Sequence, residues 1–234
     1  MTAKAILDEL RPLGTESYKK VMLNHGVPEP FFGVKIEELK KIQKRIKRDY
    51  QLALDLYETG NYDAQYLAGL IADDAKMTKR DLHRWAERAC GPLSSSIVPW
   101  VAAGSPHARE VALEWIESAK DLIAAAGWGT LSSMVALKAD ADLDLAELKR
   151  LLQRVQKTIH SVPDKVRYAM NNFVIAVGSY VEALTTLARQ TGEKIGPVTV
   201  DMGNTACTVP FAPTNIDKIA ARGAIGKKRK TVKC

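Results

Sequence analysis

Cysteine is scarce in this sequence of 234 residues, which has only Cys90, Cys207 and Cys234. The three lie far apart, no two of them form a CxxC pair, and the chain has only four histidines. These counts argue against a structural zinc site and against a disulfide framework. We therefore expect a protein without a bound metal, in the reducing environment of the cytoplasm.

Long apolar runs are also missing. No uninterrupted apolar stretch approaches the length that spans a membrane, and residues 1–14 are polar and amphipathic, unlike a signal peptide. Glycine and proline, with 15 and 10 residues, are too few for a disordered chain. The sequence therefore predicts a globular protein without a membrane anchor, of a length that suits one domain.

The common catalytic and nucleotide-binding motifs are absent as well. The chain contains no GxxxxGK[ST], HExxH, GxSxG or GxGxxG. Two pairs of adjacent carboxylates occur, Glu37-Glu38 and Asp73-Asp74, but neighbours on a helix point in different directions. We expect both pairs on the solvated surface, and no cofactor.

What the sequence does have is positive charge. There are 34 lysines and arginines against 27 acids, which gives a net charge of +7 and makes an anionic partner plausible. One basic cluster lies within residues 34–48. Its side chains could be a solvated outer face or a ridge that contacts phosphates. The candidate contacts there are Lys40, Lys44, Lys47 and Arg48.

A second basic cluster lies near the C-terminus, on a short segment that we expect to be flexible. Its attraction for nucleic acid would depend on salt and not on base sequence. A terminal segment without any partner is the alternative. The cluster consists of Lys227, Lys228, Arg229 and Lys230.

Helical periodicity dominates the chain. In residues 34–48 the apolar positions Ile36, Leu39, Ile42 and Ile46 form one stripe. Further on, Thr78 can cap a helix, with Asp81 at the third position. Short amphipathic helices with short loops predict an all-α fold of stacked helix pairs, an α-solenoid, although no strict sequence period is visible.

The pattern changes after residue 192. Residues 197–209 alternate β-branched with polar residues around Gly203-Asn204, which predicts a small β-hairpin. We expect a helical repeat domain over residues 1–192. The remainder, 193–234, would hold the hairpin, a short helix and the basic tail, packed on the same domain or following it.

Aromatic side chains are candidates for stacking on bases, but helical spacing among apolar neighbours favours the core for most of them. The four tryptophans open to both interpretations are Trp85, Trp100, Trp115 and Trp128.

Several segments together resemble a known family. FFGVKIEELKKI at 31–42 and NYDAQYLAGLIAD at 61–73 are similar to the opening motifs of the DNA alkylation repair family, of which the AlkD-type glycosylases are best known. Looser similarities follow at 96–104, 107–116 and 166–181, and the resemblance covers about residues 15–190. It implies a HEAT-like α-α superhelix whose basic concave face holds double-stranded DNA.

The same resemblance implies an enzyme that excises alkylated purines with aromatic residues and one Asp, which stabilise the developing positive charge of the sugar. Here Gly91 stands where the family has a Trp, Ser95 where it has the Asp, and Asn172 where it has a second Trp. Serine cannot supply the charge of a carboxylate. Arg109 is the counterpart of a family arginine, to within about one position, and is a candidate DNA contact.

Asn171 and Asn172 form an unusual pair in the middle of a helix, where carboxamides cost helix propensity. One of them is expected to face inward, either to contact DNA or to form a hydrogen bond between helices.

These observations favour a monomeric, DNA-binding helical repeat protein that lacks standard alkylpurine excision. Two alternatives stay open: an active DNA glycosylase with a different set of residues, and a helical scaffold that binds protein.

Overall fold

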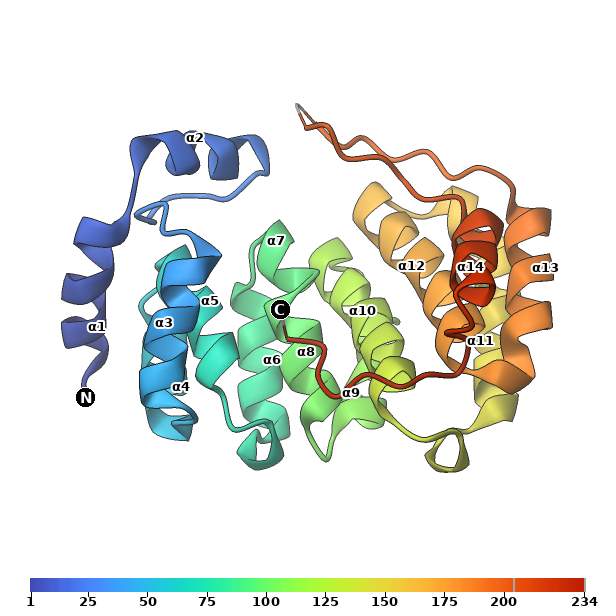
Figure 1. Cartoon of the computed structure of the whole chain (residues 1–234), viewed down its shortest axis with the longest axis horizontal. Coiled ribbons are helices and arrows are strands. Elements are labelled where there is room, and N and C mark those ends of the chain that lie inside the picture. Colours follow the sequence, from blue (N-terminus) through green and yellow to red (C-terminus); the bar gives the residue numbers. More distant parts are fainter. Residues whose placement is uncertain (204, 234) are drawn as a thin grey trace.

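The helices follow one another in a single stack, from α1 at the N-terminus to α14 (Figure 1). The computed structural model describes residues 1–203 and 205–233. Helices make up well over half of these residues, and none of the described residues belongs to a named β-strand. The predicted all-α fold is therefore confirmed. The first half contains α1 (Ala3–Leu10), η1 (Arg11–Leu13), α2 (Glu16–Asn24), α3 (Ile36–Ile46), α4 (Tyr50–Glu58), α5 (Tyr62–Ile71), η2 (Asp74–Lys76), α6 (Lys79–Arg88), α7 (Gly91–Ser94), α8 (Ile97–Gly104) and α9 (Ala108–Trp115).

The second half of the stack has longer helices. Two of them, α10 and α12, have 17 residues each and pack against each other. The elements are α10 (Asp121–Leu137), η3 (Asp140–Asp142), α11 (Leu145–Thr158), η4 (Ile159–Ser161), α12 (Asp164–Tyr180), η5 (Glu182–Leu184), α13 (Thr185–Ile195) and α14 (Ala212–Ala221).

An inner row of helices runs through the stack, in which α5, α8, α10 and α12 each contact the next. Every residue of α5 is buried, and so are most residues of α10. Small residues allow the close approach that this burial needs. A Cβ added at Gly127 of α10 would lie 2.8 Å from the backbone nitrogen of Ile116, so a larger residue does not fit there.

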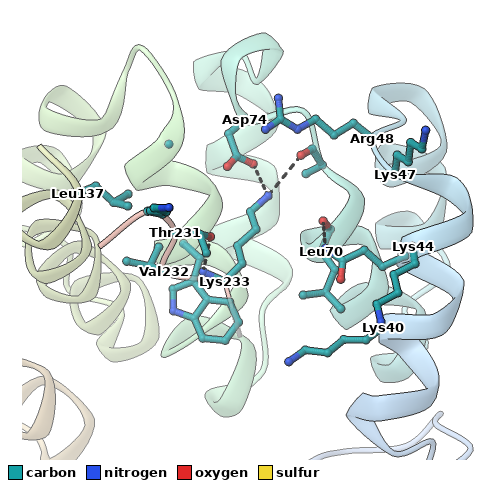
Figure 2. Close-up of a pocket in the computed structure, with 15 residues that line it drawn as sticks. Lys40, Lys44, Lys47, Arg48, Leu70, Asp74, Leu137, Thr231, Val232 and Lys233 are labelled. Atoms are coloured by element: carbon teal, nitrogen blue, oxygen red, sulfur yellow. Dashed lines mark hydrogen bonds and ion pairs between the residues drawn. The ribbon is translucent and has the colours of Figure 1, made fainter. Parts of the chain in front are cut away.

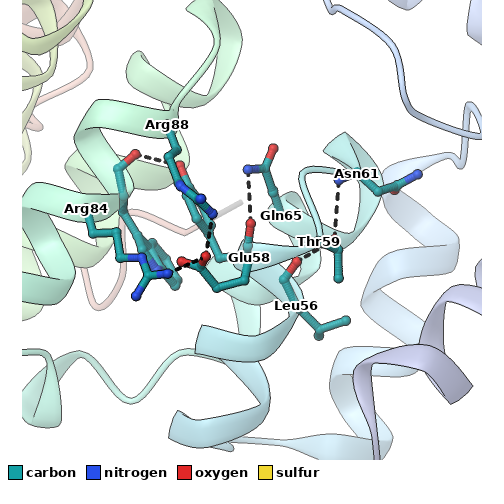
Figure 3. A network of polar contacts seen from close by, with 9 residues as sticks. Leu56, Glu58, Thr59, Asn61, Gln65, Arg84 and Arg88 are labelled. Atoms are coloured by element: carbon teal, nitrogen blue, oxygen red, sulfur yellow. Dashed lines mark hydrogen bonds and ion pairs between the residues drawn. The ribbon is translucent and has the colours of Figure 1, made fainter.

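The outer helices are held together by aromatic and charged contacts, as α4 and α6 show. The Tyr57 ring stacks on Trp85 with centroids 4.1 Å apart, and its hydroxyl donates to the Trp85 carbonyl. Glu58 accepts hydrogen bonds from both Arg84 and Arg88 (Figure 3). The start of α6 has the predicted capping box between Thr78 and Asp81.

A buried carboxylate fixes the loop before α3. Asp63 of α5 is only 2% exposed, and its two oxygens accept hydrogen bonds from the backbone N–H groups of Phe32, Gly33 and Val34, at 2.6, 3.1 and 3.1 Å. Burial raises the pKa of Asp63, while the three N–H donors act in the opposite direction. The position of α3, and of the basic residues on it, therefore depends on one carboxylate.

The predicted β-hairpin is wrong. Residues 197–203 and 205–209 form an extended loop without a strand, projecting from the end of α13 and returning to α14 (Figure 1). Side chains of α12 take up backbone groups that a hairpin would pair across its strands: Asp164 accepts from the Asp201 N–H, and Arg167 donates to the Thr199 carbonyl. The alternating pattern therefore belongs to a segment whose backbone hydrogen bonds go to α12 and not across a pair of strands.

The expectation of a flexible tail is also wrong. After α14 the chain runs back along the stack, across α10 to α8 (Figure 1). The Arg229 N–H donates to the Ala136 carbonyl at 2.8 Å, and the Lys228 ammonium donates to the Val135 carbonyl and pairs with Asp140. Val232 is buried. The tail is thus part of the folded structure.

Replacing Asp63 by Ala should destabilise the protein by about 2–4 kcal/mol, because three buried N–H groups lose a charged acceptor. Urea denaturation measures this difference. Asp8→Ala is the matched control, since Asp8 is exposed and should change stability by less than about 0.5 kcal/mol. Equal effects of the two substitutions would show that the Asp63 contacts do not hold the loop.

Candidate nucleic-acid interface

The basic cluster of residues 34–48 and the last member of the C-terminal cluster, Lys230, line one groove, although they lie about 180 residues apart in the chain. The other three members of the C-terminal cluster, Lys227, Lys228 and Arg229, are not among its lining residues. Lys40, Lys44, Lys47 and Arg48 line one side, and Lys233 lies opposite them (Figure 2). Lys230 also lines the cavity. The cavity has a volume of about 650 Å³. We call it the basic groove. Its remaining lining residues are Gln43, Leu70, Ala72, Asp74, Trp100, Gly104, Leu137, Thr231 and Val232.

The ridge of α3 is amphipathic, and this explains which cations face the groove. Leu39 and Ile42 are buried, so the basic residues must lie on the remaining faces. Lys41 pairs with Glu38, and Arg45 pairs with Glu9 of α1. Five basic residues that line the groove have no hydrogen bond or ion pair with any described residue, so their charge is available to an anion. They are Lys40, Lys44, Lys47, Arg48 and Lys230.

One ion pair anchors the tail in the groove. The Lys233 ammonium lies 2.6 Å from Asp74 and also donates to the Ala72 carbonyl (Figure 2). Burial raises the pKa of Asp74, and Lys233 and Arg48 act against this rise. The sequence predicted a solvated Asp73-Asp74 pair. That was wrong for Asp74, because its position against Gly104 of α8 leaves the carboxylate partly buried and paired with Lys233.

A second cavity, of about 530 Å³, lies between α7, α10 and α12. We call it the α7–α12 pocket. It brings Gly91 and Ser95 together with Asn172, about 80 residues further along the chain, and these are the three positions that the family resemblance matched to catalytic positions. No tryptophan, aspartate or glutamate is among its described lining residues. The others are Met22, His25, Pro92, Ser94, Pro99, Ala125, Gly129, Ser132, Ser133, Lys165, Tyr168, Ala169, Val200 and Met202.

The replaced positions leave room in this pocket. A Cβ added at Gly91 would meet only Lys165 Cε, at 3.9 Å, so the space on that side of the residue is open. Ser95 is exposed, and its hydroxyl donates to the Pro92 carbonyl at 3.1 Å. A serine engaged with its own helix supplies neither a charge nor a free base at the pocket.

Asn171 and Asn172 differ in their surroundings. Asn171 is 2% exposed and donates through Nδ2 to the Pro210 carbonyl at 2.8 Å, which ties the end of the projecting loop to α12. Asn172 lines the α7–α12 pocket and has no hydrogen bond with a described residue. Of the two interpretations of the pair, Asn171 therefore fits the packing role and Asn172 the role in a cavity.

Arg109 lies apart from both cavities. Its guanidinium forms a bidentate pair with Glu147 of α11, at 3.0 and 2.6 Å. The tryptophans also follow the expectation of core positions, since Trp85, Trp115 and Trp128 are buried. Trp100 differs, because it is partly exposed and lines the basic groove.

Sequence reasoning missed Lys233, Lys165 and Tyr168. Lys233 belongs to the basic tail but lies outside its dense cluster, and only its partner Asp74 reveals its role. Tyr168 lies about one helical turn before Asn172 and Lys165 about two turns before it, and that spacing on one face of α12 is a signal that could have found them.

Comparison with known proteins now identifies the family. The family model described as "DNA alkylation repair enzyme" matches residues 6–188. This chain belongs to the DNA alkylation repair family. It is also 33% identical, over 220 residues, to an uncharacterized protein of Listeria monocytogenes, Lmo0209, covering 92% of this chain and 95% of the relative. An uncharacterized protein of Listeria innocua, Lin0241, matches with the same identity and coverage.

A solved structure matches over the full length of both chains, with a TM-score of 0.92 and 36% identity. It is described as representing "a new family of proteins related to the HEAT-like repeat DNA glycosylases with affinity for branched DNA structures". The fold of this member of the DNA alkylation repair family is thus that of the HEAT-like repeat glycosylases. Among the described residues there is no group of side chains suited to a metal ion, and none of the helices is long and apolar enough to cross a membrane.

Replacing Lys233 by Met should destabilise the protein by about 1–3 kcal/mol, because Asp74 loses its cation in a partly buried position. Lys227→Met is the matched control, since Lys227 is exposed and forms no ion pair with a described residue. Urea denaturation measures both. In the double variant with Asp74→Asn, the loss should be smaller than the sum of the single losses. Additive losses would contradict a direct interaction between the two side chains.

Proposed function

We propose that this protein binds DNA through the basic groove and does not excise alkylated purines. The observation that carries the proposal is the convergence of two separate basic segments on one groove, with most of their cations unpaired among the described residues. Phosphates neutralise such charges and release their own counterions, which makes binding favourable and dependent on salt. The affinity of the structural relative for branched DNA supports DNA as the anion.

In this proposal the ligand is double-stranded DNA, alone or as part of a branched molecule, and the protein binds it as a monomer. Ammonium and guanidinium groups along a ridge contact the backbone and do not read bases, so paired and branched DNA can both use the groove. A single chain supplies both walls of the groove, so a second copy is not needed to complete it.

The proposed lack of excision rests on the α7–α12 pocket. Excision through an oxocarbenium-like transition state needs a negative charge near the sugar. The pocket has Ser95 and no carboxylate among its described lining residues, and no tryptophan lines it at the two positions where the family resemblance implies one, Gly91 and Asn172. An anionic group is therefore missing at the place where the chemistry would occur.

The protein should release no methylated purine from alkylated duplex DNA above the uncatalysed rate. Loss of the carboxylate removes several kcal/mol of transition-state stabilisation, or roughly a thousandfold or more in rate. Chromatography of free bases, after incubation with methylated duplex, measures release. An active HEAT-like glycosylase is the positive control. Turnover comparable with that enzyme would favour the alternative of a glycosylase with a different set of residues.

The logarithm of the DNA-binding constant should fall linearly with the logarithm of the salt concentration. Each phosphate contacted should add about 0.9 units to the slope. Truncation after Gly226 removes one wall of the groove, and we expect the slope to flatten by roughly two to four units. The second variant neutralises the other wall of the groove and should also flatten the slope. It replaces four residues by Gln: Lys40, Lys44, Lys47 and Arg48. Fluorescence anisotropy over a salt series measures the slopes.

The matched control removes the same amount of charge outside both cavities, with Lys149, Arg150, Lys157 and Lys194 replaced by Gln. These residues are exposed and line neither the basic groove nor the α7–α12 pocket. The control should keep most of the slope. If all three variants retained the slope of the natural protein, the groove would not be the DNA site, and a protein-binding scaffold would become the better interpretation.

A further inference from the structure

A third groove lies between α6 and the turn that joins α9 to α10. Two adjoining cavities, of about 430 and 390 Å³, form this groove. They are continuous, because both are lined by Glu87, Ala119, Lys120 and Ile123. Neither cavity has a lining residue in common with the basic groove or with the α7–α12 pocket. The groove is therefore a separate surface that the proposed function does not use.

The charge at this groove is opposite in sign to that of the whole protein. The chain has a net charge of +7, yet the groove is lined by four exposed carboxylates and by one lysine, Lys120. We call it the acidic groove. The four carboxylates are those of Glu87, Glu114, Glu117 and Asp121.

Part of this negative charge has no partner within the protein. Glu117 pairs with Arg154 of α11, whereas Glu87 and Asp121 form no hydrogen bond or ion pair with any described residue. In addition, α6 and α9 both end beside the groove, and the partial negative charge at the C-terminus of a helix favours a cation. The rim of the acidic groove thus suits a positively charged ligand.

The floor of the groove is apolar and held in place. Trp115 is 2% exposed, and its indole N–H donates to His83 Nδ1 at 3.0 Å. Because Nδ1 accepts, the neutral His83 ring carries its proton on Nε2, which lies 3.5 Å from Glu114. Leu122 and Ile123 are half-buried and supply apolar surface that remains open. A floor that is fixed before binding loses little conformational entropy when a ligand is bound.

The length of the groove limits the ligand to a short segment. The groove follows α6 from His83 to Ala89, and six residues of helix rise about 9 Å. An extended chain covers this length in about three residues, at about 3.3 Å each. Successive side chains of an extended segment point in opposite directions, so an apolar residue on the floor has neighbours that point away from it. Long basic side chains at those neighbouring positions can reach the carboxylates of the rim.

We propose that the acidic groove binds a basic segment of another protein, an extended stretch in which lysine or arginine flanks an apolar residue. Charge complementarity decides the choice, because an acidic, apolar-floored groove on a basic protein attracts cationic chains and repels nucleic acid. The inference does not depend on the proposed function. Since the acidic groove and the basic groove share no lining residue, one molecule can hold DNA and this partner together.

The test uses pentapeptides labelled with an uncharged dye, with glycine at both ends and an arginine on each side of a central apolar residue. The central residue is leucine, isoleucine, valine, methionine or phenylalanine. Matched probes have glutamate in place of both arginines, or glycine at the centre. Fluorescence anisotropy with the full-length protein at low salt measures binding. At least one basic probe should bind about 5- to 50-fold more tightly than the glycine-centred probe, through burial of its apolar side chain. The acidic probes should not bind.

Two variants locate the binding. Glu87→Gln with Asp121→Asn removes the unpaired charges and should weaken the basic probe about 2- to 30-fold. Ala119→Arg narrows the groove where the two cavities join and adds a positive charge, so it should also weaken the probe. The matched control, Asp8→Asn with Glu182→Gln, removes two exposed carboxylates outside the groove and should keep the affinity within about twofold. Thermal unfolding checks that each variant is folded.

The outcomes separate this inference from the proposed function. If no basic probe binds, or if the glycine-centred probe binds as tightly as the others, the inference fails. Equal weakening in the groove variant and in the control would also overturn it, because net charge alone would then explain binding. Self-association that Glu87→Gln with Asp121→Asn abolishes, measured by sedimentation, would assign the groove to a second copy and overturn the choice of another protein. Both groove variants should retain the salt slope of DNA binding, so a failure here leaves the proposed function unchanged.

Discussion

The close packing of the inner row is the constraint on which the rest of the structure depends. Helix α5 is buried along its whole length, and α10 nearly so, because Gly127 and neighbouring small residues bring the helices into contact. Helices buried on almost every side have little surface left for charged groups. The basic and acidic side chains that line the two cavities therefore come mainly from elements outside the row, namely α2, α3 with the turn after it, η2 and the tail, and from an exposed position of α12, Lys165.

The arrangement explains how far the sequence could predict the structure. Helical periodicity is a local property, so the stacked helices, the stripe of α3 and the capping box at Thr78 followed from the sequence. The hairpin and the flexible tail did not, because both errors concern segments whose hydrogen bonds go to distant partners. Asp164 and Arg167 hold the loop, and Asp74 holds the tail, and neither relationship leaves a local pattern.

The candidate site divides in the same manner. The basic residues were visible as clusters, yet only the fold shows that Lys40 and Lys230 line a single groove. The family resemblance located Gly91, Ser95 and Asn172, and these do meet at one pocket. It could not show that the space beside Gly91 is open. At Gly91, where the resemblance places an aromatic side chain, this open space forms part of the pocket.

The path of the tail has a consequence for the order in which the two walls of the basic groove form during synthesis. Residues 230–233 line the groove opposite α3, so the N-terminal half carries only one wall when it leaves the ribosome. Helices α3 to α8 can fold and expose their ridge early, but the groove has both walls only after residues 230–233 have also been synthesised. Chains that end before residue 230 would then differ from longer ones in the electrostatics of the groove as well as in length.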